Sequence, residues 1–129
     1  MRRIVTGHND NGKSIVTIDG PPARSIGEDV GGLFELWNTD GNEVISTDVI
    51  DRADDEIILS PPVGGTKFRY FQINPLPEGV PEDMLQEIAA DAFEKVGAAH
   101  HRVDTSKHPA MHKTAVSYTH LRAHETGND

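Results

Sequence analysis

The chain has 129 residues, no cysteine and a formal net charge of −9. An acidic surface does not attract phosphate backbones or anionic lipid headgroups, so neither nucleic acid nor a membrane is expected as a partner. Without cysteine there is no disulfide or thiolate chemistry, and no apolar run approaches the ~20 residues of a membrane span or forms a signal peptide after Met1. These properties predict a cytoplasmic domain.

Two short runs near the start are predicted as strands, residues 2–7 and 13–19, the second of them rich in β-branched side chains. Residues 8–12 between them end in Asn-Gly, which favours the positive φ angles of a hairpin turn. Gly-Pro-Pro at residues 20–22 should end the second strand, because proline removes a hydrogen-bond donor.

The middle of the chain predicts further strands separated by loops. Residues 33–37 form a third strand, and the acidic stretch 43–55 is expected to be mostly irregular. Residues 56–59 are interpreted as a short strand, and residues 67–73 as a longer one because their side chains alternate. Its two faces would carry Phe68, Tyr70 and Gln72 on one side and Arg69, Phe71 and Ile73 on the other.

One amphipathic helix is predicted over residues 82–96. Pro81 suits its first position, Glu82 and Asp83 suit its positive end, and Gly97 suits the position after its last turn. A helix this short is marginal alone in water, so its apolar stripe should pack on another element. The stripe comprises Leu85, Ile88, Ala89, Ala92, Phe93 and Val96.

Histidines gather after this helix, at positions 100, 101, 108 and 112. Imidazole is the commonest transition-metal ligand, so converging histidines would define a site. Pro109 disfavours a helix that would bring His108 and His112 together, and the simplest interpretation of His100 and His101 is a solvated loop. No Ser/His/Asp nucleophile order follows from the spacing.

An ordered set of segments resembles the N-terminal region of small cupin-domain proteins. The segments are residues 2–8, 10–14, 19–22, 35–40, 61–69 and 108–114. The resemblance implies a mainly β fold with one α-helix, in which N-terminal strands and the start of an incomplete cupin barrel, an antiparallel jelly roll, are present. Residues 1–107 would form the strand region and helix that lead into the cupin, and residues 108–114 would enter the first barrel strand.

The same resemblance implies a small-molecule pocket in the barrel mouth and a homodimer. In cupins the metal motif is His-x-His, then a carboxylate, then a distant histidine. His112 matches its first histidine, whereas Thr114 stands in place of the second. The pocket candidates are therefore His108, His112 and Thr114, with His112 alone as a metal ligand. We expect no cofactor in the chain itself and at most a divalent metal in the parent protein.

The C-terminal tail differs in character from the rest. Val116–Thr126 resembles an in-frame translation of a sequencing-library adaptor, so residues 115–129 are expected to be non-native and the cupin truncated at about Thr114. On this interpretation His120 and His124 do not extend the histidine set.

Two functions remain open for the parent. It is either an enzyme acting on a small organic acid or secondary metabolite, as a decarboxylase, isomerase or oxygenase, or a non-catalytic module that binds a small molecule. The 129-residue chain itself is expected to be inactive under both.

Overall fold

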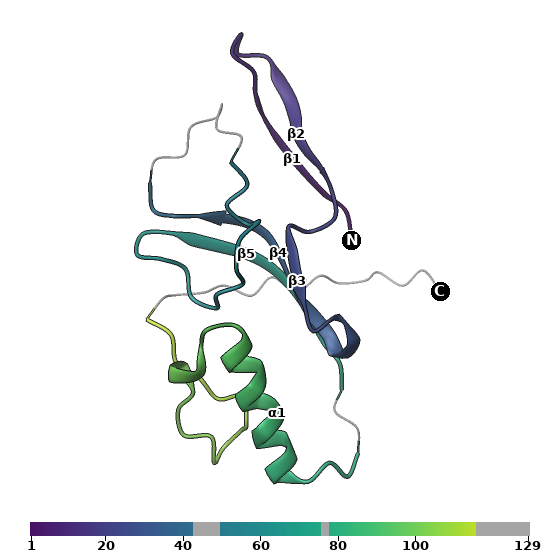
Figure 1. Cartoon of the computed structure of the whole chain (residues 1–129), viewed down its shortest axis with the longest axis vertical. Coiled ribbons are helices and arrows are strands. Elements are labelled where there is room, and N and C mark those ends of the chain that lie inside the picture. Colours follow the sequence, from purple (N-terminus) through teal and green to yellow (C-terminus); the bar gives the residue numbers. More distant parts are fainter. Residues whose placement is uncertain (43–49, 76–77, 116–129) are drawn as a thin grey trace, which may run out of the picture.

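The computed structural model describes residues 1–42, 50–75 and 78–115. Within these ranges it contains two antiparallel sheets and one α-helix (Figure 1), which confirms the predicted mainly β composition. The strands are β1 (Arg3–His8), β2 (Ser14–Gly20), β3 (Arg24–Ile26), β4 (Gly31–Thr39) and β5 (Thr66–Ile73). The helices are the 3-10 turn η1 (Glu28–Val30), α1 (Glu82–Lys95) and the 3-10 turn η2 (Ala99–His101). No helix in the described ranges is long and apolar enough to cross a bilayer.

The first two predicted strands pair as the hairpin β1–β2. Its turn differs from the expected Asn-Gly turn, because only Gly12 takes a positive φ, of 72°. The Asn9 side chain organises the loop instead: its Oδ1 accepts from the backbone N–H of Asn11 at 3.1 Å and of Lys13 at 3.0 Å. Asn9 thus holds the loop through its side-chain oxygen in addition to its backbone, whose N–H donates to the Lys13 carbonyl at 3.0 Å and whose carbonyl accepts from the Gly12 N–H at 2.8 Å.

The second sheet has the strand order β3-β4-β5. Strand β3 was not expected, since three residues are too few to show an alternating pattern. Strand β4 contains a bulge between Glu35 and Trp37, whose partners on β5 are consecutive residues. The extra residue returns Trp37 to the same face as Phe34. That face carries the cross-strand pairs Phe34–Tyr70 and Trp37–Phe68.

A small apolar core lies beneath the opposite face of this sheet, toward α1 (Figure 1). Its members are Ile57, Val96 and Ala98, with Ile26, Leu33, Leu59 and Phe93 packed around them. The short strand predicted at residues 56–59 is wrong. Ile57 instead enters the core from an irregular segment, and the Leu59 N–H donates to the Val96 carbonyl at 2.9 Å rather than to another strand.

The helix starts and stops close to its predicted limits. It begins at Glu82, with Pro81 as the extended residue before it rather than as its first position. Gly97 closes it with φ 63°, and the Ala98 N–H bonds back to the Phe93 carbonyl at 2.8 Å. No residue of the helix is fully buried. Its contribution to the core is the partly buried Phe93.

An ion pair is enclosed between the sheet and the irregular segment. Glu35 is 1% exposed and lies opposite Arg69 on β5. The Arg69 Nε donates to Glu35 Oε1 at 2.6 Å, and its two terminal nitrogens donate to the carbonyls of Leu59, at 2.6 Å, and of Ile58. With its amide nitrogen turned toward Glu35, Asn38 donates to Oε2 at 2.9 Å. The carboxylate is thus paired and hydrogen-bonded at both oxygens, as a buried charge must be.

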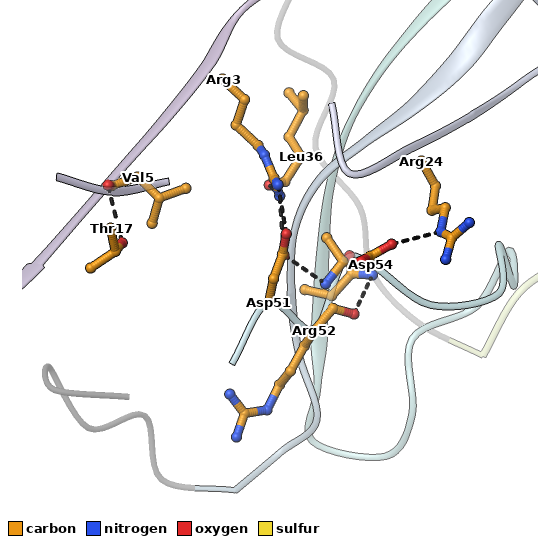
Figure 2. Close-up of polar contacts among 10 residues, drawn as sticks. Arg3, Val5, Thr17, Arg24, Leu36, Asp51, Arg52 and Asp54 are labelled. Carbon is orange, nitrogen blue, oxygen red and sulfur yellow. Dashed lines mark hydrogen bonds and ion pairs between the residues drawn. The ribbon is translucent and has the colours of Figure 1, made fainter. Parts of the chain in front are cut away.

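The hairpin β1–β2 is attached to the second sheet through Arg3 (Figure 2). The Arg3 guanidinium donates to Asp51 Oδ1 at 3.0 Å and Oδ2 at 2.5 Å, and to the Leu36 carbonyl at 3.1 Å. A second pair, Arg24–Asp54, ties β3 to the same irregular segment at 2.8 Å. Residues 50–58 have no helix or strand, as predicted for the part of the acidic stretch that they cover. Residues 43–49 and 116–129 lie outside the described residues.

Candidate functional site

The histidine-containing segment after α1 folds back along the helix. Its Arg102 donates to Gln86 Oε1 at 2.9 Å and to the Pro109 carbonyl at 3.0 Å, while Gln86 Nε2 donates to the Thr105 carbonyl at 2.9 Å. An isolated antiparallel bridge also joins Arg102 to His112. These contacts fix residues 99–114 to α1 without a regular strand.

The three predicted pocket residues have different environments. His108 is exposed, and its Nδ1 accepts from the Ala110 N–H at 3.1 Å, which places the proton of the neutral ring on Nε2. His112 has the opposite tautomer, because its Nδ1 lies 2.9 Å from the Ala110 carbonyl and must donate to it. Its ring packs against Phe93, with centroids 5.0 Å apart. Thr114 is half-buried.

These tautomers decide which atoms can receive a proton or a metal. The Nε2 of His112 holds a lone pair, whereas the acceptor nitrogen of His108 is already used by the backbone. No group of three or more His, Asp or Glu side chains converges anywhere in the described part of the chain. Among the described residues, His112 is therefore a single candidate metal ligand without converging partners. It is also the residue that matches the cupin motif.

His101 was expected to lie in a solvated loop, but it is half-buried and bonded at both ring nitrogens. Its Nδ1 lies 3.0 Å from the Lys113 carbonyl, and its Nε2 lies 3.1 Å from Ser60 Oγ. The adjacent His100 is exposed, as expected, and its ring lies 4.1 Å from that of His101. The sequence offered no signal for the Ser60–His101 pair, because 41 positions separate its members.

A shallow depression of about 340 Å³ lies apart from these histidines, at the edge of the core. It is lined by Arg24, Ser25, Ile26, Asp55, Glu56, Ile57 and Lys95. Both of its cations already have carboxylate partners, Arg24 with Asp54 at 2.8 Å and Lys95 with Asp91 at 2.7 Å. The hydrogen bond that Lys95 donates to Asp91 raises the pKa of Lys95. The depression therefore offers little unpaired charge to an anionic ligand.

Comparison with known proteins finds no matching family model, no matching curated protein and no matching solved structure.

Proposed function

We propose that residues 1–114 are the N-terminal part of a cupin-type protein that binds a small organic molecule in its barrel. The ordered set of cupin-like segments carries this proposal, and the antiparallel, mainly β architecture is compatible with it. In the parent, an enzyme would act on a small organic acid or secondary metabolite, as a decarboxylase, isomerase or oxygenase. The parent would be a cytoplasmic homodimer.

His112 would be the functional side chain in this enzyme. Its Nε2 lone pair is the atom that would bind a divalent metal or accept a proton, while the Phe93 contact and the Ala110 carbonyl orient the ring. The His108 and Thr114 side chains would add hydrogen bonds to the ligand from the same segment. Because Thr114 replaces an imidazole, the pocket would hold a metal with fewer histidines than a complete cupin site.

The alternative function is a binding module without chemistry. Thr114 in the place of the second motif histidine favours it, because catalytic metal sites use about three protein ligands. In that case His108, His112 and Thr114 would provide only hydrogen bonds to the ligand.

The source DNA after the Thr114 codon separates these possibilities. A carboxylate and a distant histidine at cupin spacing would favour the enzyme, and a barrel sequence lacking them would favour the binding module. A downstream sequence without alternating strands would contradict the cupin proposal itself. Native codons that encode Val116–Thr126 would contradict the adaptor origin of the tail.

A further inference from the structure

We propose that Ser60 is a reactive nucleophile, activated by His101, that is acylated by small activated esters. This inference is independent of the cupin proposal, because it uses none of His108, His112 or Thr114. It rests on three groups joined by hydrogen bonds: the Ser60 hydroxyl, the His101 imidazole and the Lys113 backbone carbonyl.

The direction of each hydrogen bond follows from the chemistry of these groups. A carbonyl oxygen can only accept, so the 3.0 Å contact with the Lys113 carbonyl places a proton on His101 Nδ1. In the neutral ring Nε2 then carries the lone pair. Ser60 Oγ, 3.1 Å away, must therefore direct its hydroxyl proton at this base. A nucleophile bonded to a base that a third group orients is the arrangement that activates serine.

Backbone contacts hold the two side chains in this relation. The Lys113 N–H donates to the His101 carbonyl at 2.8 Å, so that His101 and Lys113 are joined through both ring and main chain. On the serine side, the neighbouring Leu59 N–H is fixed to the Val96 carbonyl at 2.9 Å. Ser60 and His101 are both half-buried, which leaves part of each open to a reagent.

The chain also contains a second Ser–His pair, in which no third group orients the imidazole. Ser14 Oγ lies 3.3 Å from His8 Nε2, but the buried His8 Nδ1 has no hydrogen-bond partner in the described structure. No carbonyl therefore fixes the tautomer of His8. The reactivity of Ser14, relative to that of Ser60, therefore measures the effect of the Lys113 carbonyl on the serine–histidine pair.

The reaction balances with an ester and water as the only reactants. Ser60 Oγ attacks the ester carbonyl carbon while His101 Nε2 takes the hydroxyl proton. The C–O bond to the leaving group then breaks, and His101 returns the proton to the departing alkoxide or phenoxide. Water attacks the acyl-serine with the same base, which releases the acid and restores Ser60.

The surroundings limit the class of ester. The depression at the core edge is lined by other residues, so it provides no acyl-binding pocket for Ser60. Small esters with a good leaving group, such as aryl acetates, are therefore the expected substrates.

The test is incubation of the full chain with p-nitrophenyl acetate, followed by mass spectrometry of the acetylated peptides and by release of p-nitrophenol. We expect acetylation of Ser60 at least about tenfold faster than that of Ser14. His101→Gln, which retains a hydrogen-bonding side chain but has no base, should slow acetylation of Ser60 by about a hundredfold, the usual contribution of a general base. Ser60→Ala should abolish the label at this position.

His100→Ala is the matched control, since this ring neighbours His101 but does not bond to Ser60. It should leave the acetylation rate unchanged. Equal labelling of Ser60 and Ser14 in the unaltered chain would overturn the proposal without any variant. Undiminished acetylation of Ser60 in a folded His101→Gln variant, as judged by circular dichroism, would overturn it as well.

Discussion

The ion pairs of this small molecule differ in how far they are enclosed. The buried Glu35 carboxylate depends on Arg69 and Asn38, whereas the Arg2–Asp19 pair has side chains 68% and 43% exposed. Solvent screens the exposed pair more strongly than the enclosed one, whose side chains are 12% and 1% exposed. The two pairs should therefore respond differently to loss of one partner.

We expect Arg69→Met to lower the free energy of unfolding by about 3–5 kcal/mol, because it leaves Glu35 buried and unpaired together with the carbonyls of Ile58 and Leu59. Urea denaturation monitored by the fluorescence of Trp37 measures the change. Arg2→Met, the control, should have little effect. An equal response of the two variants would show that burial of Glu35 does not decide the outcome.

Asp40 gives a pH-dependent prediction. The backbone N–H of Asn42 is the main cause that lowers the pKa of this carboxyl to about 2, and Arg52, 3.1 Å from it, adds to the effect. Its folded pKa lies below the unfolded value of about 3.9. Its contribution to stability is therefore complete above about pH 4 and lost as the pH falls through about 2.

Carboxyl-carbon NMR should place the Asp40 titration midpoint near pH 2, and Arg52→Gln should raise the midpoint only partly, since the Asn42 bond remains. Arg24→Gln removes a cation that pairs with Asp54 instead and should leave the midpoint in place. A midpoint near 3.9 in the unaltered chain would contradict the hydrogen bonds assigned to this carboxyl.

At the scale of elements, Arg3 attaches the hairpin β1–β2 to the second sheet. Arg3 reaches from β1 to Asp51 and to the Leu36 carbonyl (Figure 2), whereas most side chains of β2 are exposed. An isolated hairpin is marginally stable in water. The stability of the hairpin should therefore depend more on the Arg3 contacts than on its own cross-strand pairs.

Arg3→Gln should loosen the hairpin without unfolding β4 and β5. Hydrogen exchange is expected to become faster by tenfold or more at the backbone amides of β1 and β2, a change of about 1.4 kcal/mol in local opening. Arg2→Gln is the control, because Arg2 precedes β1 and pairs across the hairpin with Asp19 instead of with the second sheet. Uniform acceleration over both sheets would instead mean that Arg3 supports the whole fold.

The end of α1 depends on glycine. Gly97 has φ 63°, and a Cβ built there would lie 3.1 Å from Ile58 Cδ1. Gly97→Ala should therefore reduce the free energy of unfolding by about 1–2 kcal/mol, the cost of a left-handed alanine. Gly20, with no atom within 4 Å of its built Cβ, is the control, and Gly20→Ala should change thermal unfolding little. Equal melting temperatures for the two variants would refute the role of φ at position 97.

The sequence predicted those elements whose pattern is local. The alternation at residues 67–73 and the helix signals at Pro81 and Gly97 lie within single segments, and the structure confirms both elements within one residue. It did not predict β3, which is too short to alternate, and it misassigned residues 56–59 because a buried irregular segment is as apolar as a strand. The Ser60–His101 pair could not be predicted, because the two residues are 41 positions apart and meet only through the tertiary fold.

At the scale of the whole molecule, the seven histidines do not amount to a metal site by number alone. Tight binding needs about three ligands held in a rigid frame, and ordering a flexible segment around an ion opposes binding through lost entropy. Of the candidates, His112 has an Nε2 lone pair that can bind a metal, whereas Nε2 of His108 carries the ring proton. Any affinity of the chain for zinc should therefore be weak.

Isothermal titration with zinc should give a dissociation constant above about a micromolar, which corresponds to less than about 8 kcal/mol of binding free energy. His112→Ala is the paired variant. Submicromolar binding that disappears in His112→Ala would reveal a preformed site at this residue and contradict the prediction.

The Glu35–Arg69 pair also selects one alignment of β4 against β5. Side chains alternate along a strand, so a slip by a single residue would turn Glu35 toward the face of Phe34 and Tyr70, away from the carbonyls that receive Arg69. Such a slip would also carry the apolar side chains of β4 to the other face of the sheet. The buried charge adds a separate cost to the same error, because Glu35 would lose Arg69, so this pair makes misaligned sheets unfavourable in addition to apolar packing.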